Sequence, residues 1–368
     1  MTPRASTTCW TLACVTLLAA CNGASIPNPL SSGGGSDVQV KEITNLSPRA
    51  SVVLDKNCPD LVQPYRLADN VASMTMFSVK EGLKGVTGQL TSMLSGKSAA
   101  PTTGGSLSGS TKLAAKQLNW MPMTAEEMYA ERQHNKRTDL LSRTSKMGKK
   151  YYPTADKMLA DILASINEPY DYRFKLFIVK TDNRNALALP GGYLYLDQGL
   201  LDTPEHQRKA YFALAHEIGH VLQRHETKEM QSLVVDSFTV KEELVDTIQS
   251  ARNNPGAVVD RIKLEKGQFT QHHVDQELQA DSCAVKMLSH VYPDNQQLAA
   301  TIDTFVKDLP QVRPVAPSGT SGGSVQAVSE EVYDIVNSPM MRHPNTRERT
   351  DNLQAIYREV TSTTTAAQ

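Results

Sequence analysis

Along most of this chain, apolar residues recur at the spacing of amphipathic α-helices. In the segment 154–166 they lie three or four positions apart, which places Met158, Leu159, Ile162 and Leu163 on one side of a helix. An earlier helix is expected to open at a capping box, Thr124-x-x-Glu127, and to run to about Ser145. Similar patterns predict further helices at about 204–222, 228–251, 270–289, 294–308, 328–336 and 345–359.

A short region with the composition of β-strands interrupts this helical pattern. Residues 174–180 form an apolar run, and 185–189 and 193–196 follow on either side of Pro190-Gly191-Gly192. The proline and glycines make the last two segments a hairpin or a bent edge strand. A small sheet followed by many helices predicts a mainly helical α+β fold.

One predicted helix carries the sequence His216-Glu217-Ile218-Gly219-His220. Asp202 or Thr203 is placed to cap this helix, with Pro204 in its first turn. Residues four apart lie about 40° apart round a helix axis, so the two histidines share one face and can bind one Zn²⁺. Glu217 beside them is placed to act on a water bound to that metal. The alternative is a polar helix face with two solvated histidines.

A catalytic zinc site needs a third protein ligand, and the segment after Val274 offers one. Glu277 and Asp281 are spaced four apart in a helical pattern, so they share a face. Glu277 is the candidate ligand, and Asp281 is placed to accept the outer N–H of a ligand histidine. Without a zinc helix upstream, the same pair would be read as a solvated acidic surface.

Together these motifs resemble the gluzincin metallopeptidases of the HtpX and CAAX-prenyl-protease type. The resemblance covers about residues 150–360, and it includes the edge-strand segment from Asn185 and the late segment His343-Pro344 with Arg349 six residues on. No apolar run reaches the length of a membrane span, which makes the chain more similar to the soluble, LoiP-like periplasmic lipoproteins of that family.

The resemblance implies one zinc ion per chain, bound by His216, His220 and Glu277. It also implies a general base at Glu217, a supporting role for Asp281, and roles for His343 and Arg349 beside the scissile bond. His343 has a second possible role as a fourth zinc ligand that holds the enzyme inactive. Its simplest reading is a turn residue before Pro344. His225, about 140° round a continuous helix from His220, is interpreted as structural and not as a ligand.

The resemblance further implies that the substrates are unfolded or misfolded envelope proteins, which would make this a quality-control protease. An edge strand can pair with any extended peptide backbone, and the candidate strand is formed by Asn185, Ala186, Leu187, Ala188 and Leu189. An ordinary core hairpin is the alternative for this segment. For the whole chain, the alternative function is a latent or non-catalytic lipoprotein that acts as a chaperone or scaffold.

The first residues read as a bacterial lipoprotein signal. Arg4 precedes a short apolar run, and Leu18-Ala19-Ala20-Cys21 resembles a lipobox, which makes Cys21 the predicted site of lipidation. Cleavage of an ordinary secretory signal elsewhere is the alternative. Several acyl chains on Cys21 would anchor the protein stably to a membrane. Asn22 after the cysteine favours the periplasmic face of the outer membrane.

Two cysteines, Cys58 and Cys283, remain after the predicted signal and lipidation site. An even pair in an oxidising compartment suggests a disulfide, with two buried free thiols as the alternative. The predicted organisation begins with a signal peptide (1–20), a flexible tether (21–50) and an accessory segment with a low-complexity linker (51–115). A zinc metallopeptidase domain (116–360) and a disordered tail (361–368) follow. The net charge of −1 and the lack of a basic run give no reason to expect a nucleic-acid partner.

Overall fold

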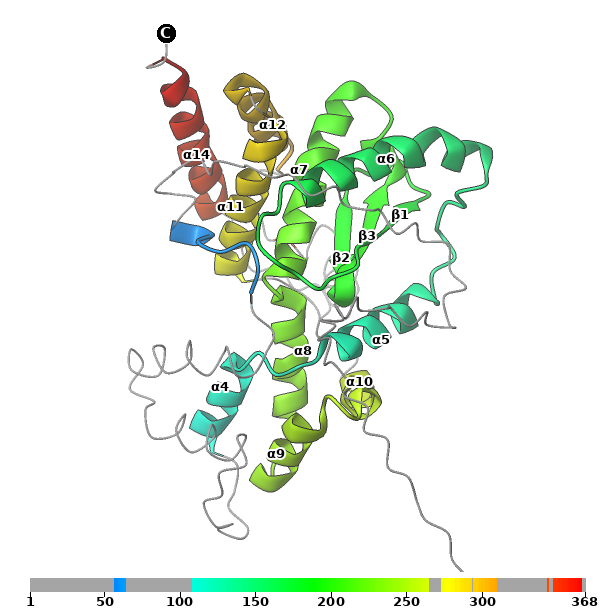
Figure 1. Cartoon of the computed structure of the whole chain (residues 1–368), viewed down its shortest axis with the longest axis vertical. Helices are drawn as coiled ribbons and strands as arrows, with labels where there is room; N and C mark the ends of the chain where they lie inside the picture. Colours follow the sequence, from blue (N-terminus) through cyan, green and yellow to red (C-terminus); the bar gives the residue numbers. More distant parts are fainter. Residues whose placement is uncertain are drawn as a thin grey trace, which may run out of the picture. The chain divides into compact units, whose positions relative to one another are not determined.

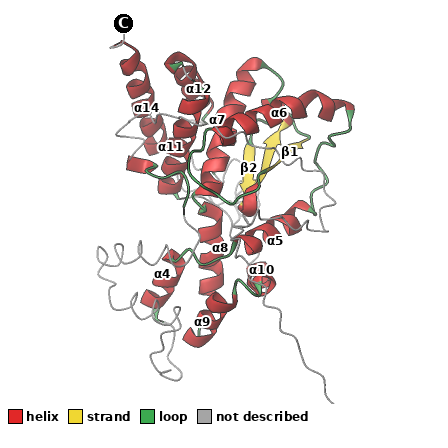
Figure 2. Cartoon of the chain, in the orientation of Figure 1, coloured by secondary structure: helices red, strands yellow, loops and turns green. Residues whose placement is uncertain are grey.

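The computed structural model describes residues 56–63, 108–264, 273–292, 294–309, 343 and 347–365 (Figures 1 and 2). All of them belong to one compact unit, Gly35–Gln368. The predicted lipidation site Cys21 and the predicted helix at 328–336 lie outside the described residues. No helix among the residues described is both long enough and apolar enough to cross a bilayer.

The predicted strands form one mixed sheet, with strands β1 (Lys175–Val179), β2 (Ala186–Leu189) and β3 (Tyr193–Asp197). Their order is β1-β3-β2, with β1 parallel and β2 antiparallel to β3, so β2 lies at an edge of this sheet. A 3₁₀ turn, η1 (Pro190–Gly192), joins β2 to β3. Gly191 has a φ of 76°, and a Cβ there would lie 2.9 Å from the backbone nitrogen of Glu127, so the turn needs glycine.

Helices α6 (Lys146–Ala164) and α7 (Pro204–Leu222) pack against this sheet. On its other side α7 contacts α11 (Val274–Val291), and α12 (Asn295–Asp308) and α14 (Arg347–Thr365) lie beside that pair (Figure 1). One apolar core joins the inner faces of these helices to the sheet. The observed elements agree with the predicted mainly helical α+β fold.

Two local features explain how α7 and α11 come together. The Thr203 hydroxyl accepts a hydrogen bond from His206 N, and Pro204 occupies the first turn, so α7 begins where the sequence predicts. Further along α7, Gly219 faces α11, and a Cβ on it would lie 3.2 Å from Ala280 O. This glycine therefore allows the close approach of the two helices that carry the candidate ligands.

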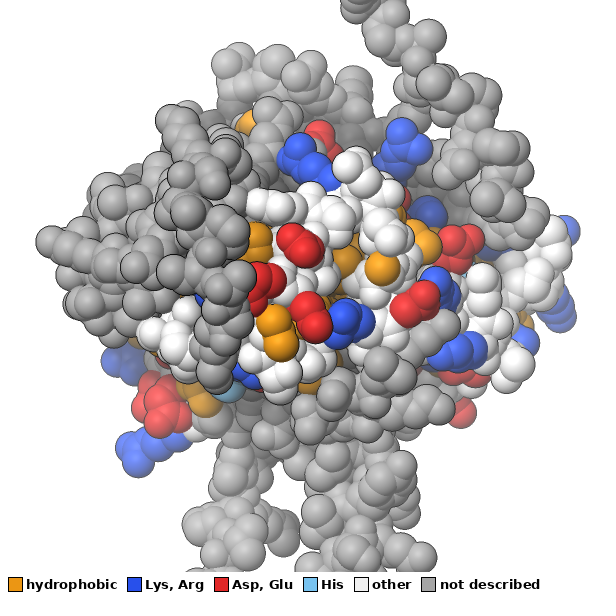
Figure 3. Space-filling view, turned by 90° about the horizontal axis from the view of Figure 1, so that it is seen from below, with side chains coloured by type: hydrophobic (Ala, Val, Ile, Leu, Met, Phe, Trp, Pro, Cys, Tyr) orange, Lys and Arg blue, Asp and Glu red, His pale blue; other side chains and the backbone are white. Residues whose placement is uncertain are grey.

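A second apolar cluster gathers α4 (Gly109–Gln117), α5 (Met123–His134), α8 (His225–Asp236), α9 (Lys241–Ser250) and α10 (Pro255–Leu264). These helices occupy the lower part of Figure 2. The predicted domain boundary at residue 115 falls inside α4, which packs against α8. On the face seen in Figure 3, acidic and basic side chains of the described residues are interspersed.

Two helix predictions in this region are wrong. The helix expected from a capping box at Thr124 to about Ser145 differs at both ends: Pro122 is the N-cap of α5, without a side-chain cap, and α5 ends at His134. Instead, Gln231 on α8 accepts from Met121 N, so a tertiary contact fixes the entry to α5. The single helix expected at 228–251 is broken into α8 and α9, and Phe238 in the break is buried in the second cluster.

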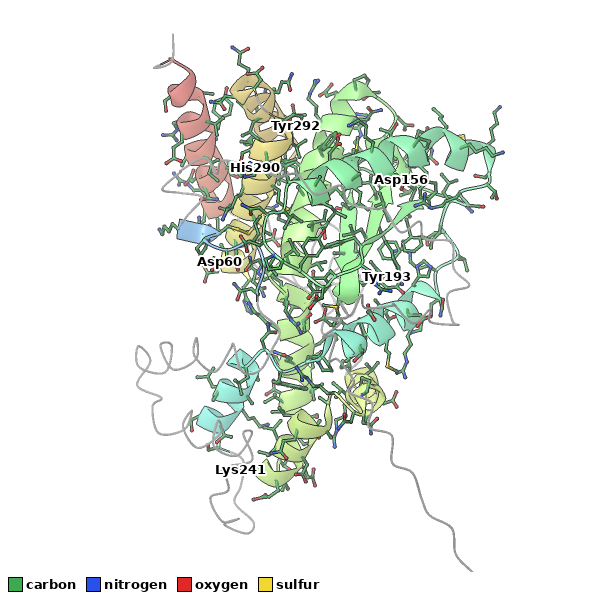
Figure 4. All side chains as sticks on the ribbon, viewed as in Figure 1. Asp60, Asp156, Tyr193, Lys241, His290 and Tyr292 are labelled. Atoms are coloured by element: carbon green, nitrogen blue, oxygen red, sulfur yellow. A yellow bond between two sulfur atoms is a disulfide. The ribbon has the colours of Figure 1, made fainter. Side chains whose placement is uncertain are left out.

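Residues 56–63 lie across the end of α7 and the side of α11. Cys58 forms a disulfide bond with Cys283 of α11, with their Cα atoms 5.3 Å apart. Glu168 accepts hydrogen bonds from the backbone nitrogens of Leu61 and Val62, at 2.8 and 2.9 Å. Gln223, just after α7, donates to the carbonyl oxygen of Asp60, which is labelled in Figure 4. This segment therefore joins the end of α7 to the middle of α11, the two ligand-bearing helices.

Candidate metal centre

Four side chains from three separate segments of the sequence converge where α7 meets α11. Their ligand atoms, from His216, His220, Glu277 and His343, lie within 4.8 Å of one another. The Nε2 atoms of His216 and His220 are 2.9 Å apart, and His343 Nδ1 lies 3.0 Å from Glu277 Oε1. His220 Nε2 lies 3.3 Å from that same oxygen. His216, His220 and Glu277 are buried, whereas His343 is half-buried.

This donor set fits a zinc ion in both spacing and charge. Ligands at ordinary zinc–nitrogen and zinc–oxygen distances in a tetrahedron lie about 3.3 Å from one another, close to the separations observed. Among the described residues, the region also holds three buried carboxylates, on Glu217, Glu277 and Asp281, against one guanidinium, that of Arg349. With neutral imidazoles, the excess negative charge is that which a divalent cation neutralises.

Asp281 and Arg349 contact the candidate ligands His216 and Glu277. Asp281 Oδ1 lies 2.8 Å from His216 Nδ1, the nitrogen turned away from the other ligands, as the sequence predicts for a carboxylate that orients this ring. Arg349 donates two hydrogen bonds to Asp281, at 2.6 and 2.9 Å. Its third nitrogen lies 2.8 Å from Glu277 Oε2. The buried guanidinium thus binds two site carboxylates at once.

Opposing effects set the ionisation of these groups. Burial by itself would raise the pKa of Glu277, but His343 and Arg349 beside it hold that pKa well below its usual range. Burial likewise opposes ionisation of Asp281, yet Arg349 and His216 keep its pKa low. Both carboxylates are therefore charged at neutral pH, the form that binds a metal or orients a ligand.

Glu217, the candidate general base, has contacts on both of its oxygens. Oε2 accepts a hydrogen bond of 2.7 Å from the backbone nitrogen of Ala188, on the edge strand β2. Oε1 lies 3.2 Å from Nε2 of His343. His343 therefore contacts the ligand group with one ring nitrogen and the candidate base with the other.

The candidate substrate strand lies directly beside this group. Ala186–Leu189 form the edge strand β2, and α7 packs against it. Asn185 precedes the strand, and its backbone nitrogen donates to the Asp197 side chain at 3.0 Å. Ala188 N donates a hydrogen bond to Glu217, which places this edge strand beside the candidate base.

Two residues lie on the side of His220 that faces away from the ligand group: His225, which was interpreted from the sequence as structural, and Gln279, to which no role was assigned. His225 begins α8, and its Nδ1 lies 2.8 Å from Nδ1 of His220. Gln279 on α11 contacts the other ring nitrogen of His225 at 3.0 Å. A continuous helix would have placed His225 elsewhere, but Arg224 between α7 and α8 adopts a left-handed conformation with φ 58°. The sequence shows that His225 lies five residues after His220, but it does not show the left-handed turn at Arg224.

Phe305 also lies near the site, and no sequence pattern had marked it. It lies on α12, and its ring stacks on Phe212 of α7 with centroids 4.1 Å apart. Its centroid lies 6.4 Å from that of His216, and the Arg349 guanidinium carbon lies 5.6 Å from it. An aromatic wall therefore borders the ligand group on the α12 side.

Comparison with known proteins agrees with this geometry. A search of curated proteins finds no match to this chain. Residues 153–357, more than half of the chain, match peptidase family M48. The matched range includes every ligand candidate, the candidate base Glu217 and the edge strand. The chain therefore belongs to peptidase family M48, a family of metal-dependent peptidases.

Proposed function

We propose that this protein is a zinc-dependent endopeptidase that cleaves unfolded or misfolded proteins of the bacterial cell envelope. The observation that carries the proposal is the position of Glu217, next to a buried group of two imidazoles and one carboxylate that fits a zinc ion. His216, His220 and Glu277 would hold the metal. A zinc ion in this group supplies a Lewis acid that polarises a peptide carbonyl and activates water.

The chain's own residues supply the remaining chemistry. Glu217 accepts the proton of the attacking water and then delivers it to the leaving amine. Ala188 N positions the Glu217 carboxylate through its 2.7 Å hydrogen bond. Arg349 and Asp281 hold Glu277 and His216 in place. In this proposal Arg349 acts through those carboxylates, and not as a donor to the reacting carbonyl.

The position of His343 suggests a resting state of the enzyme in which the site is occupied. Its Nδ1 lies among the candidate ligands, 3.3 Å from His216 Nε2, and its Nε2 contacts Glu217. With His343 in this position, both the open ligand position and the general base are occupied. We propose that the described arrangement is latent, and that His343 moves away when a substrate binds.

Backbone pairing explains how such an enzyme would select its substrates. An extended peptide beside β2 would form hydrogen bonds that do not depend on its side chains. Any unfolded segment meets that requirement, whereas a folded protein rarely presents one. Unfolded envelope proteins are therefore the proposed substrates.

The proposed location is the periplasmic face of the outer membrane, with a lipid anchor at Cys21. The lipobox-like sequence before Cys21 supports an anchor. The Cys58–Cys283 disulfide supports an oxidising compartment, because such bonds are rare in the cytosol.

The decisive experiment compares the parent chain with Glu217→Gln for zinc content and for cleavage of casein. We expect Glu217→Gln to bind zinc and to lose activity by about 10²–10⁴-fold, the usual contribution of a general base. Glu205→Gln, an exposed change on the same helix, is the matched control. Equal cleavage by parent and Glu217→Gln, or a parent that binds no zinc, would show the proposal to be wrong.

A further inference from the structure

Behind the candidate ligand His220, two side chains form a short chain of hydrogen bonds. His220 turns Nε2 toward the ligand group, 2.9 Å from His216 Nε2. Its other nitrogen, Nδ1, lies 2.8 Å from Nδ1 of His225. His225 Nε2 in turn lies 3.0 Å from Oε1 of Gln279. His220 and His225 are fully buried.

The proton positions along this row of hydrogen bonds follow from its two ends, which are Nε2 of His220 and Oε1 of Gln279. A neutral imidazole carries one N–H and one acceptor nitrogen. If Nε2 of His220 binds a metal, its proton is on Nδ1, and that N–H donates to His225. His225 Nδ1 must then be the acceptor, which leaves its own proton on Nε2. That N–H donates to Gln279 Oε1, an oxygen that can only accept, so each donor meets an acceptor.

We propose that His225 and Gln279 are positioning residues that fix the tautomer and ring plane of His220 for metal binding. This inference rests on the proposed zinc site. The carboxylate of Asp281 contacts His216 in the equivalent way, but His225 and Gln279 are uncharged. Orientation by neutral groups adds no charge to a buried region that already holds three carboxylates.

The turn between α7 and α8 makes this contact possible. On an uninterrupted helix His225 would lie about 140° round the axis from His220. Arg224 instead adopts φ 58° and ψ 38°, which redirects the chain so that the first residue of α8 faces back to His220. Arg224 is held there by a buried ion pair of 2.6 Å with Glu126 and by a hydrogen bond to Met121 O.

Two substitutions of His225 separate its acceptor nitrogen from its bulk. His225→Phe keeps a ring of similar size but offers no acceptor, whereas His225→Asn places an oxygen near the Nδ1 position. Zinc affinity of the full chain is measured by competition with a chelator. We expect His225→Phe to bind zinc about 10–100-fold more weakly than the parent and His225→Asn to recover most of that loss. His206→Phe, on α7 but away from the site, is the matched control and should match the parent.

A merely structural role would give a different result. It would lower the unfolding temperature of the metal-free variants while His225→Phe and His225→Asn bind zinc equally well. That outcome, or a His225→Phe variant with parental zinc affinity, would overturn the inference. Nitrogen NMR of the zinc-bound parent adds a second readout: His220 should carry its proton on Nδ1, and a proton found on Nε2 would also overturn it.

Gln279 is tested by a double-mutant cycle. Gln279→Leu should weaken zinc binding less than His225→Phe does, and the double variant should bind no more weakly than His225→Phe alone, because Gln279 acts through His225. If the losses of zinc affinity in the two single variants simply added in the double variant, the inference that Gln279 acts through His225 would be overturned. If the parent itself binds no zinc, both the proposed function and the positioning role of His225 and Gln279 fail. If the parent binds zinc but the zinc affinities of the variants differ from those expected, the positioning role alone fails.

Discussion

His343 Nε2 lies 3.2 Å from Glu217 Oε1, while its Nδ1 lies 3.0 Å from Glu277 Oε1. One imidazole thus bridges the candidate general base and a candidate metal ligand. Its removal should free both positions. We expect His343→Ala to cleave casein faster, by up to about tenfold, which is the factor for a chain that rests closed in roughly nine molecules of ten.

The control for this prediction is His290→Ala, because His290 lies near the end of α11 and outside the ligand group (labelled in Figure 4). Its activity should equal that of the parent. A loss of cleavage in His343→Ala would instead show that His343 stabilises the oxyanion during turnover.

The same imidazole should make the metal-free protein sensitive to pH. Burial alone would lower the pKa of His343, but Glu277 and Glu217 raise it from 6.5 to about 9. The folded state then holds a proton that the unfolded chain releases at lower pH. This contribution to the free energy of unfolding is fully present below about pH 6.5 and is lost as the pH rises through about 9.

Thermal unfolding in the presence of a chelator measures this effect. We expect the unfolding temperature of the metal-free parent to fall between pH 6.5 and about 9, and that of His343→Ala to change less across the same window. Parallel profiles for the two proteins would mean that His343 is not the group that titrates.

The disulfide should stabilise the domain and, through α11, the metal site. Cys58 and Cys283 close a loop with a sequence separation of 225 residues, and Cys283 follows Asp281 by two positions. Loss of a native disulfide typically costs about 2–5 kcal/mol. Cys58→Ala/Cys283→Ala should therefore unfold at lower denaturant concentration than the parent. Addition of a reductant should shift the parent to the same midpoint and leave the variant unchanged; any other result contradicts the prediction.

Arg349 forms ion pairs with both Glu277 and Asp281, and all three side chains are buried. Truncation at Arg349→Leu leaves two buried carboxylates without that partner, which costs about 3–5 kcal/mol in comparable sites. We expect a lower free energy of unfolding in urea together with weaker zinc binding. Arg349→Lys keeps the charge but not the forked geometry, so its free energy of unfolding and its zinc affinity should lie between those of the parent and of Arg349→Leu. An Arg349→Leu variant as stable as the parent would contradict this role.

Much of the site is local in the sequence and was therefore predictable. His216 and His220 share one face because four residues span about one helical turn, and Glu217 follows His216 directly, so no tertiary contact is needed to bring the three together. Glu277 and Asp281 follow the same rule on α11. The edge strand was marked by its apolar run and by the Pro190-Gly191-Gly192 turn that ends it.

Errors arose where long-range contacts overrule local preference. α5 begins before Thr124 because Met121 bonds to Gln231, more than a hundred positions away in the chain. His225 is not among the candidate ligands, as interpreted, but it lies against His220 and not about 140° round the axis, because Arg224 leaves the right-handed helical conformation. The buried partner of Arg224, Glu126, belongs to a different helix. Neither partner can be inferred from spacing along the chain.

The sequence by itself determined the chemistry of this protein: which side chains can bind a metal, which carboxylate can act as a base, and the family to which they belong. Helical periodicity suffices for those inferences, because it acts over a few residues. The tertiary structure alone decided how the groups meet. It brought His343 between Glu277 and Glu217, joined Arg349 to two carboxylates, and turned His225 back to His220. Such contacts depend on the packing of distant helices, which local sequence patterns do not specify.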